Sequence, residues 1–298
     1  EDLKNKTVVI APLDWGMGHL TRCLPLVRLF LKNDCKVILA GTTFQCHWMK
    51  KECPSIVTEE ISGYQIQLDA NKSTYWQMLL QSSKMFKAIR SEQEVAEFLP
   101  KKCAVDFIIS DTRYGFNSLN AHNIFITHQL SPPVPKLRAT VTKKILRWVN
   151  KFNECWIQDE KSNSLCGDLN NEELKIPKTF IGWASRFSKL NLVSESKFCF
   201  IASGPEPQLT NFSILVSGLL KQSGEKYQLI VPKDLGLENQ LINPTTTELN
   251  RIINSSEIII SRSGYTSVME LLAINKKVVF VPTPGQFEQE YLANRISN

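Results

Sequence analysis

The sequence lacks several features that would place it in a special class of proteins. No apolar run reaches the roughly 18 residues that a membrane-spanning helix needs, and the N-terminal segment has no signal-peptide pattern. The eight cysteines form no Cys-x-x-Cys pair and have no histidine cluster beside them, and an Asp-x-Asp element is absent. We therefore expect a cytoplasmic protein with reduced, buried thiols that requires no metal and no other cofactor.

Strong charge of one sign is also missing. Hydrophobic residues make up 43% of the chain and charged residues 21%, which is an ordinary globular balance. The net charge is +6, and residues 1–190 hold 26 Lys and Arg against 19 Asp and Glu. This basic excess favours an anionic partner, such as a phosphate or an acidic membrane surface, but it is too diffuse to indicate nucleic acid.

The sequence is rich instead in short, nearly continuous apolar runs with helical patterns between many of them. The runs are 6–13, 35–41, 105–111, 123–129, 154–159 and 178–183, then 197–204, 227–232, 257–264 and 276–285. Such strands are typical of parallel sheets that are buried on both faces. The chain length and the polar, Ser-rich segment 184–196 predict two doubly wound, Rossmann-like α/β domains, 1–186 and 187–298, that face each other across a ligand-binding cleft.

The first strand is followed by Asp14-Trp15-Gly16-Met17-Gly18-His19 and, three residues later, Arg22. Gly16 and Gly18 let a ligand approach the backbone closely. His19 at the helix start can act as a general base near pH 7, and Arg22 can pair with a phosphate or carboxylate. The loop matches neither a dinucleotide nor a P-loop fingerprint. A glycine turn with a solvent-exposed histidine is the alternative interpretation.

Two further strand-end loops of the first domain carry polar side chains. Asp111 and Arg113 follow one strand, and His128 follows the next. All three could face the cleft, and Asp111 is an alternative general base. Local turn capping is the competing explanation for this group.

The second domain offers three loops for a ligand. Ser203 and Gly204 leave a strand just before a helix, whose backbone N–H groups could hold a phosphate, although two prolines also fit a plain rigid connection. Two later strand ends place further polar groups near one rim; these groups are Arg262, Ser263, Gly264, Thr266, Glu270, Gln286, Glu288 and Gln289. A helix carboxylate can accept both ribose hydroxyls, so this set suits a nucleotide. For Glu270 a solvated helix face is the alternative.

With these motifs the chain resembles the GT-B glycosyltransferases, and in particular the peptidoglycan lipid-linked N-acetylglucosaminyltransferase family. The likeness lies in Gly16-Met17-Gly18-His19 and in the block SRSGYTSVMELLA…VPTPGQFEQEYLA. The resemblance implies a nucleotide-sugar donor, UDP-linked, bound by the second domain, and a glycan or lipid-linked acceptor hydroxyl bound by the first.

The same resemblance assigns roles to single residues. It places Glu270 on the ribose hydroxyls and Gln289 near the donor sugar. Ser263, Gly264 and Thr266 then lie near the diphosphate, and His19 acts as the base on the acceptor. The chain departs from the family at Asp14-Trp15, where an extra glycine is usual, and few residues follow Gln289. We therefore expect the final helix, which usually crosses back to the first domain, to be shortened or missing.

The first loop, GMGHLTRCLPL, is also similar to that of the UDP-sugar hydrolase of the pseudaminic-acid pathway, which shares the GT-B fold. By that resemblance His19 would activate water instead of an acceptor hydroxyl. A nucleotide-sugar hydrolase or epimerase is therefore the alternative to a transferase. A nucleotide-binding module without catalysis is the third hypothesis for the function.

The segment 135–152 has six Lys and Arg, no acid and an apolar stripe at helical spacing. An ordinary helix that packs its stripe on the sheet is one interpretation. The other is a basic amphipathic surface for an anionic membrane or a lipid-linked acceptor, which would give the protein a peripheral place at the inner face of the membrane. The sequence pattern of the segment 78–99 predicts one or two further helices.

Overall fold

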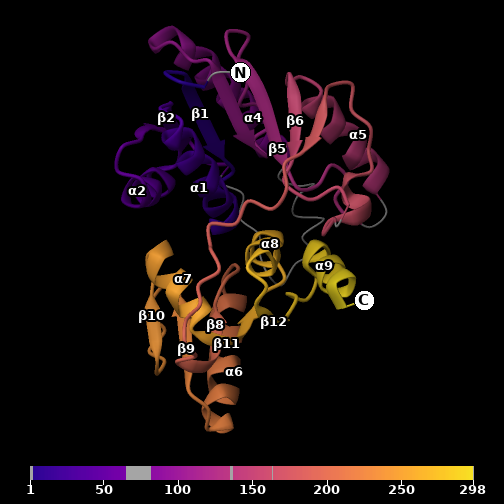
Figure 1. Cartoon of the computed structure of the whole chain (residues 1–298). Coiled ribbons are helices and arrows are strands. Elements are labelled where there is room, and N and C mark those ends of the chain that lie inside the picture. Colours follow the sequence, from indigo (N-terminus) through magenta and orange to yellow (C-terminus); the bar gives the residue numbers. More distant parts are fainter. Residues whose placement is uncertain (1–2, 65–81, 135–136, 163, 298) are drawn as a thin grey trace. The chain divides into compact units, whose positions relative to one another are not determined.

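The computed structural model describes residues 3–64, 82–134, 137–162 and 164–297. Over these residues the chain divides into two compact units, of which the first ends at Ala184 and the second begins at Ser185 (Figure 1). Parts of two expectations lie outside the described residues, namely positions 78–81 of the stretch 78–99 and positions 135–136 of the basic segment.

In the described part of the first unit, seven parallel strands form one sheet. They are β1 (Thr7–Pro12), β2 (Lys36–Gly41), β3 (Val57–Glu60), β4 (Phe107–Asp111), β5 (His122–Thr127), β6 (Glu154–Ile157) and β7 (Lys178–Phe180). Their order is β3-β2-β1-β4-β5-β6-β7, so the winding reverses between β1 and β4. Doubly wound sheets bind ligands at this switch point, outside the carboxyl ends of the strands.

Helices cover both faces of this sheet. They are α1 (Met17–Lys32), α2 (Thr43–Glu52), α4 (Ser82–Lys102) and α5 (Arg138–Val149), with a 3-10 turn at Gly167–Asn170. Alternate residues of β1 point to opposite faces, as a strand requires. Val8 and Ile10 pack with α1 and α2, whereas Val9 and Ala11 pack with α4. Core residues of β5 and β6 pack on α5.

The described residues of the second unit form a sheet of five parallel strands. They are β8 (Ser196–Ile201), β9 (Tyr227–Val231), β10 (Gln240–Ile242), β11 (Ser256–Ser261) and β12 (Lys277–Phe280), in the order β10-β9-β8-β11-β12. The helices are α6 (Gln208–Ser223), α7 (Thr246–Asn254), α8 (Tyr265–Ala273) and α9 (Phe287–Ser297). The buried apolar residues of α6 pack on one face of the sheet, and those of α7 and α8 pack on the other face.

The apolar stripe of the basic segment is used inside the first unit. Ile145, Trp148 and Val149 on α5 are buried. The ring of Trp148 contacts Phe86 of α4 with 5.8 Å between centroids, and Lys144 Nζ lies 3.8 Å from the centroid of the Phe86 ring. The stripe therefore packs on the protein core, as the first interpretation holds, and only the basic face of α5 remains for a membrane surface.

Candidate functional site

The loop between β1 and α1 brings His19 to the switch point of the first sheet. Gly16 has a φ of 73°, a region that glycine enters at little cost. The N-terminus of α1 has no side-chain cap and no acidic residue in its first turn. His19 stands in that first turn, and Arg22 follows at a spacing of three, so both side chains lie on one face of the helix.

Asp111 reaches the same place from β4. The parallel register pairs Pro12 with Asp111, so the two strands end side by side. The Nε of Arg22 donates to Oδ2 of Asp111 at 2.7 Å, and Nη2 of Arg22 donates to Oδ1. The Arg22 residue is 2% exposed and the Asp111 residue 0% exposed. The two residues thus form a fork-to-carboxylate ion pair inside the protein, the strongest geometry that such a pair adopts.

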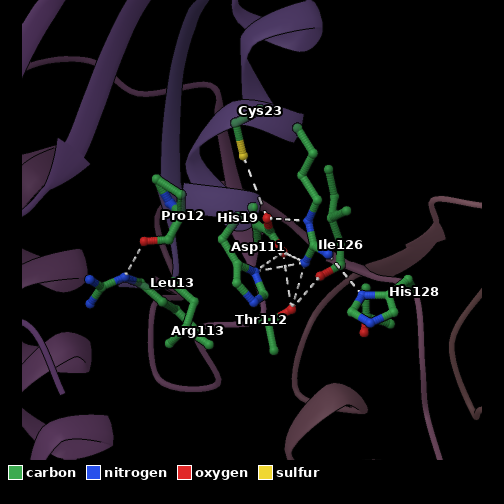
Figure 2. Close-up of polar contacts among 12 residues, drawn as sticks. Pro12, Leu13, His19, Cys23, Asp111, Thr112, Arg113, Ile126 and His128 are labelled. Atoms are coloured by element: carbon green, nitrogen blue, oxygen red, sulfur yellow. Dashed lines mark hydrogen bonds and ion pairs between the residues drawn. The ribbon is translucent and has the colours of Figure 1, made fainter. Parts of the chain in front are cut away.

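His19 completes the cluster and is its accessible member. Its Nδ1 lies 3.2 Å from Oδ1 of Asp111 and 2.8 Å from Nη2 of Arg22. The His19 side chain is 14% exposed, whereas that of Asp111 is 0% exposed. Figure 2 shows His19 between Asp111 and Thr112, with dashed contacts converging on its ring. A ligand that enters from solvent therefore meets the imidazole and not the carboxylate behind it.

The electrostatics of the cluster keep the imidazole neutral and the carboxylate ionised. Burial, followed by the charge of Arg22, lowers the pKa of His19 below its ordinary 6.5, and together they outweigh the raising effect of Asp111. Burial alone would raise the pKa of Asp111, but Arg22 and His19 outweigh it and hold that pKa well below its usual range. A neutral imidazole beside an ionised carboxylate is the arrangement that a general base needs near pH 7.

Thr112 is a member of the cluster that sequence reasoning missed. Its φ is 60°, which is unusual for a β-branched residue. Its hydroxyl donates to Oδ1 of Asp111 at 3.0 Å and lies 3.3 Å from Nη2 of Arg22. Such backbone strain gathers at functional sites. The local residue types do not predict this conformation, in which the backbone N–H of Thr112 donates to the carbonyl of Ile126 at 3.1 Å.

His128 joins the cluster from the end of β5. Its Nδ1 lies 2.8 Å from Nη1 of Arg22, and the side chain of Asn170 donates to its backbone carbonyl at 2.8 Å. The residue is 5% exposed. The structure thus brings together four of the sequence-predicted residues: His19, Arg22, Asp111 and His128.

Arg113 lies apart from this cluster, in a buried network of its own. It is 0% exposed, and its Nη1 donates to Glu92 Oε1 at 2.6 Å while its Nε donates to the carbonyl of Pro12 at 2.8 Å. Tyr64 donates its hydroxyl to the other Glu92 oxygen at 2.9 Å. Figure 2 shows Arg113 turned towards Pro12 and away from His19. This placement favours a structural role for Arg113 over the expected contact with substrate.

In the second unit, Glu270 lies on α8 with its carboxylate already engaged. The Nε of Arg186 lies 3.0 Å from one carboxylate oxygen and 3.3 Å from the other, and Glu270 is 3% exposed. Burial raises the pKa of Glu270, although Arg186 opposes the shift. The sequence prediction did not include Arg186, because it stands in a polar segment that has no motif. The solvated helix face is not the environment of Glu270.

Several other predicted residues of this unit hold the loops around α8 together. Ser263 donates its hydroxyl to the carbonyl of Gln289 at 2.8 Å, and the Gln289 side chain accepts from the backbone N–H of Thr283 at 2.9 Å. The side-chain amide of Gln289 donates to Gln286 Oε1 at 2.6 Å. Arg262 donates to the carbonyl of Pro282 at 3.0 Å. These bonds join the loops after β11 and β12 into one rim.

The helix starts of the second unit differ in how they are capped. At α6, near Ser203 and Gly204, the carboxylate of Glu206 accepts from the backbone N–H and the hydroxyl of Thr210. At α9 the backbone N–H of Gly285 donates to Glu290, and Glu288 also lies in the first turn. Helix α8 begins at Tyr265, with Gly264 as its N-cap, and has no acid in its first turn. The first turn of α6 also lacks an acid, but there the carboxylate of Glu206 lies against the helix start. The N-terminus of α8 is therefore the best suited of the three to an external anion.

Among the residues that the structure describes, no group of His, Cys, Asp and Glu side chains is arranged to hold a metal ion. None of the helices among the same residues is long and apolar enough to cross a bilayer.

Comparison with known proteins adds to this geometry. Residues 200–298 match the family model of the glycosyltransferase family 28 C-terminal domain. A 51-residue stretch is 41% identical to the UDP-N-acetylglucosamine--N-acetylmuramyl-(pentapeptide) pyrophosphoryl-undecaprenol N-acetylglucosamine transferase of Rhodopseudomonas palustris. That stretch spans 17% of this chain and 14% of the enzyme.

Solved structures resemble the whole chain. Arabidopsis thaliana UGT89C1 has a TM-score of 0.67 at 15% identity, covering 98% of this chain and 82% of its own. The glycotransferase of kitacinnamycin has a TM-score of 0.63 at 13% identity, with 98% and 84% covered. Phytolacca americana UGT2, solved with UDP-2-fluoro-glucose and pterostilbene, has a TM-score of 0.61 at 12% identity, with 97% and 82% covered. At these identities the likeness shows the fold, and it confirms the GT-B class predicted from the sequence.

Proposed function

We propose that this protein is a glycosyltransferase that moves a sugar from a UDP-linked donor to an acceptor hydroxyl. The observation that carries the proposal is the match of residues 200–298 to the family 28 C-terminal domain, which includes α8 with Glu270. The whole-chain likeness to glycosyltransferases and the His19–Asp111 pair support the same function. The proposal includes independence from metals, which addition of a chelator would test.

The donor nucleotide is proposed to bind around α8. The N-terminus of α8, which has Gly264 as its N-cap and no acid in its first turn, presents a positive dipole end to the diphosphate. In this proposal Ser263, Gly264 and Thr266 surround that position. Glu270, held by Arg186, is proposed to accept the ribose hydroxyls, and Gln289 lies at the rim where the donor sugar would bind.

The acceptor is proposed to bind near His19 in the first unit. When Nδ1 of His19 donates to Asp111, the lone pair on Nε2 is available to the acceptor hydroxyl. His19 then takes the hydroxyl proton while the acceptor oxygen attacks the anomeric carbon and the bond from that carbon to the UDP oxygen breaks. The ionised Asp111 stabilises the imidazolium that forms. In this proposal the positive N-terminal end of α8 stabilises the leaving diphosphate.

A lipid-linked or glycan acceptor, with peripheral contact at an anionic membrane, is the second part of the proposal. Lys143 and Arg147 are exposed on α5, and Lys151 is exposed just after it. Lys84 and Lys87 are exposed on α4, which contacts α5 through Phe86 and Trp148. The residues 82–91 and 138–151 contain no acid, so this face attracts anionic headgroups.

UDP release from a panel of UDP-sugars, measured first without and then with candidate acceptors, tests the function. A transferase releases UDP quickly only when an acceptor is added, and the sugar appears on that acceptor. Fast release of free sugar and UDP without an acceptor would identify a hydrolase, in which His19 activates water. Absence of UDP binding would contradict both readings.

A further inference from the structure

Arg22 is enclosed in a way that does not suit the phosphate contact expected from the sequence. The residue is 2% exposed, and both arms of its guanidinium are engaged inside the protein. Nε and Nη2 bind Asp111, Nη2 also faces His19, and Nη1 faces His128. A substrate phosphate could reach this group only by displacing a buried carboxylate, which would leave Asp111 as an unpaired charge.

The guanidinium places a chemical constraint on both histidines. Its five N–H groups only donate, and it has no accepting atom. A hydrogen bond between Nη1 of Arg22 and Nδ1 of His128 at 2.8 Å therefore requires a lone pair on Nδ1, so that the ring proton of neutral His128 sits on Nε2. The same reasoning applies to Nδ1 of His19, which lies 2.8 Å from Nη2 of Arg22.

His19 has a second neighbour that demands the opposite arrangement. Asp111 Oδ1, which lies 3.2 Å from the same Nδ1, only accepts, so it pairs with His19 when Nδ1 carries the proton. Arg22 and Asp111 thus compete for one ring nitrogen, and the contact with Arg22 is the shorter. The charged and titratable groups that face His19 are Arg22, Asp111 and His128.

Thr112 supplies the alternative partner that an exchange needs. Its hydroxyl oxygen lies 3.3 Å from the Nη2 atom that faces His19. When His19 turns its Nδ1–H to Asp111, the released N–H of Arg22 can donate to Thr112 without breaking the ion pair with Asp111. The left-handed backbone of Thr112 holds its hydroxyl at this point.

We infer that Arg22 is a positioning residue that sets which nitrogen carries the ring proton of His19 and of His128, and that it is not a ligand for a substrate phosphate. In the ligand-free protein both rings carry the proton on Nε2. To act as the base on the acceptor, His19 changes to the tautomer that carries its proton on Nδ1 and its lone pair on Nε2. In this change Nε2 loses a proton to water and Nδ1 gains one from water, so the net charge is unchanged. The role of that second form in catalysis rests on the proposed function, whereas the resting form does not.

Nitrogen-15 NMR of histidine-labelled wild-type protein tests the resting form directly. The chain has only four histidines, and the exposed His47 serves as an internal reference outside the cluster. Ring nitrogen shifts and two-bond couplings report which nitrogen is protonated. We expect His19 and His128 in the Nε2–H form without ligand. A spectrum with His19 in the Nδ1–H form would overturn the inference whatever the enzyme's activity.

Two variants extend the test. Arg22→Lys keeps the charge but loses the fork, so we expect His19 to shift towards the Nδ1–H form paired with Asp111; unchanged ring shifts in a folded variant would contradict the inference. Thr112→Val removes the alternative acceptor and should lower turnover at least tenfold while His19 stays in the Nε2–H form. Full turnover by Thr112→Val would exclude the exchange. If NMR of the wild-type protein shows His19 and His128 in the Nε2–H form but the protein has no activity with any UDP-sugar, the proposed function fails and the role of Arg22 stands.

Discussion

Gly63 lies so close to Asp14 that a Cβ atom on residue 63 would stand 2.2 Å from Oδ2 of Asp14. The backbone N–H of Tyr64 donates to the same oxygen at 3.0 Å. Asp14 belongs to the loop that leads into α1, so this contact ties the loop that precedes His19 to the segment after β3. The Asp14 carboxylate can lie against residue 63 and accept the hydrogen bond from Tyr64 only because residue 63 has no side chain.

Gly63→Ala is therefore expected to displace Asp14 and loosen the loop before His19. We expect a loss of about 1–3 kcal/mol in the free energy of unfolding, as for other overpacked sites, together with reduced turnover. Gly218→Ala is the control, because a Cβ there meets no atom within 4 Å on helix α6; it should leave stability unchanged or raise it by about 0.5–1 kcal/mol. Urea unfolding measures both. Equal stabilities for the two variants would show that Asp14 can move freely.

His19→Ala should abolish turnover and spare UDP binding. Removal of a general base costs about 10²–10⁴ in rate, and the nucleotide is proposed to bind the other unit. Because the pKa of His19 is lowered, the neutral base persists below pH 6.5, so the acid limb of kcat/KM in the wild type should lie under that value. The exposed His122 gives the control variant, His122→Ala, which should keep full activity. A fully active His19→Ala would refute the role.

Asp111→Asn should cost both stability and activity. It leaves the buried Arg22 without its counter-charge, a change worth about 3–5 kcal/mol. The depressed pKa of Asp111 means that its stabilising contribution is present above the unfolded-state pKa and is lost as the pH falls through the lower, folded-state value. Asp106→Asn is the matched control, since the Asp106–Lys6 pair is partly exposed and such pairs contribute about 0–1 kcal/mol. Urea unfolding at pH 7 compares them; equal losses would contradict the buried pair.

Glu270→Gln should weaken UDP binding, measured by calorimetry, at least tenfold. The pKa of Glu270 is raised by burial, and ribose hydroxyls donate to the ionised form, so UDP affinity should fall as the pH drops through that raised value. Glu257→Gln, a change at an exposed carboxylate on β11 that pairs with Lys197, should leave affinity unchanged. Unaltered UDP affinity in Glu270→Gln would remove Glu270 from the ribose site.

The basic face of α5 should bind anionic vesicles through charge alone, because its apolar stripe is buried. Co-sedimentation with vesicles containing phosphatidylglycerol should be strong at low salt and lost near 0.5 M salt, since screening at about that ionic strength shortens the range of the attraction. The triple variant Lys143→Gln, Arg147→Gln, Lys151→Gln should lose the binding. Salt-insensitive binding, or none at all, would contradict the electrostatic contact.

Much of the fold follows from the sequence because buried parallel strands are continuous apolar runs. The strand-and-helix order around β1, β4, β8 and β11 is predicted correctly for that reason. The edge strands β3 and β10 were missed, since each is short and lies partly exposed. Helices α2 and α7 were also missed, although Thr42 with Gln45 and Thr245 with Glu248 form capping boxes that mark their starts.

The site was harder to predict than the fold. The sequence places His19 and Arg22 one helical turn apart, and strand ends suggest that Asp111 and His128 lie near them. It does not tell which polar groups bind one another and which face a ligand. Arg22 and Arg113 look equivalent in sequence, yet both turn inwards to different carboxylates, because the pairing of β1 with β4 decides what each one meets.

The interval between His19 and Arg22 has a consequence for how this region can vary. Each residue of an α-helix turns by about 100°, so inserting or deleting one residue between these two would rotate one side chain away from Asp111 while the strand-borne partners stayed in place. Exchange of residue types at this turn can therefore preserve the cluster, whereas a change in its length cannot.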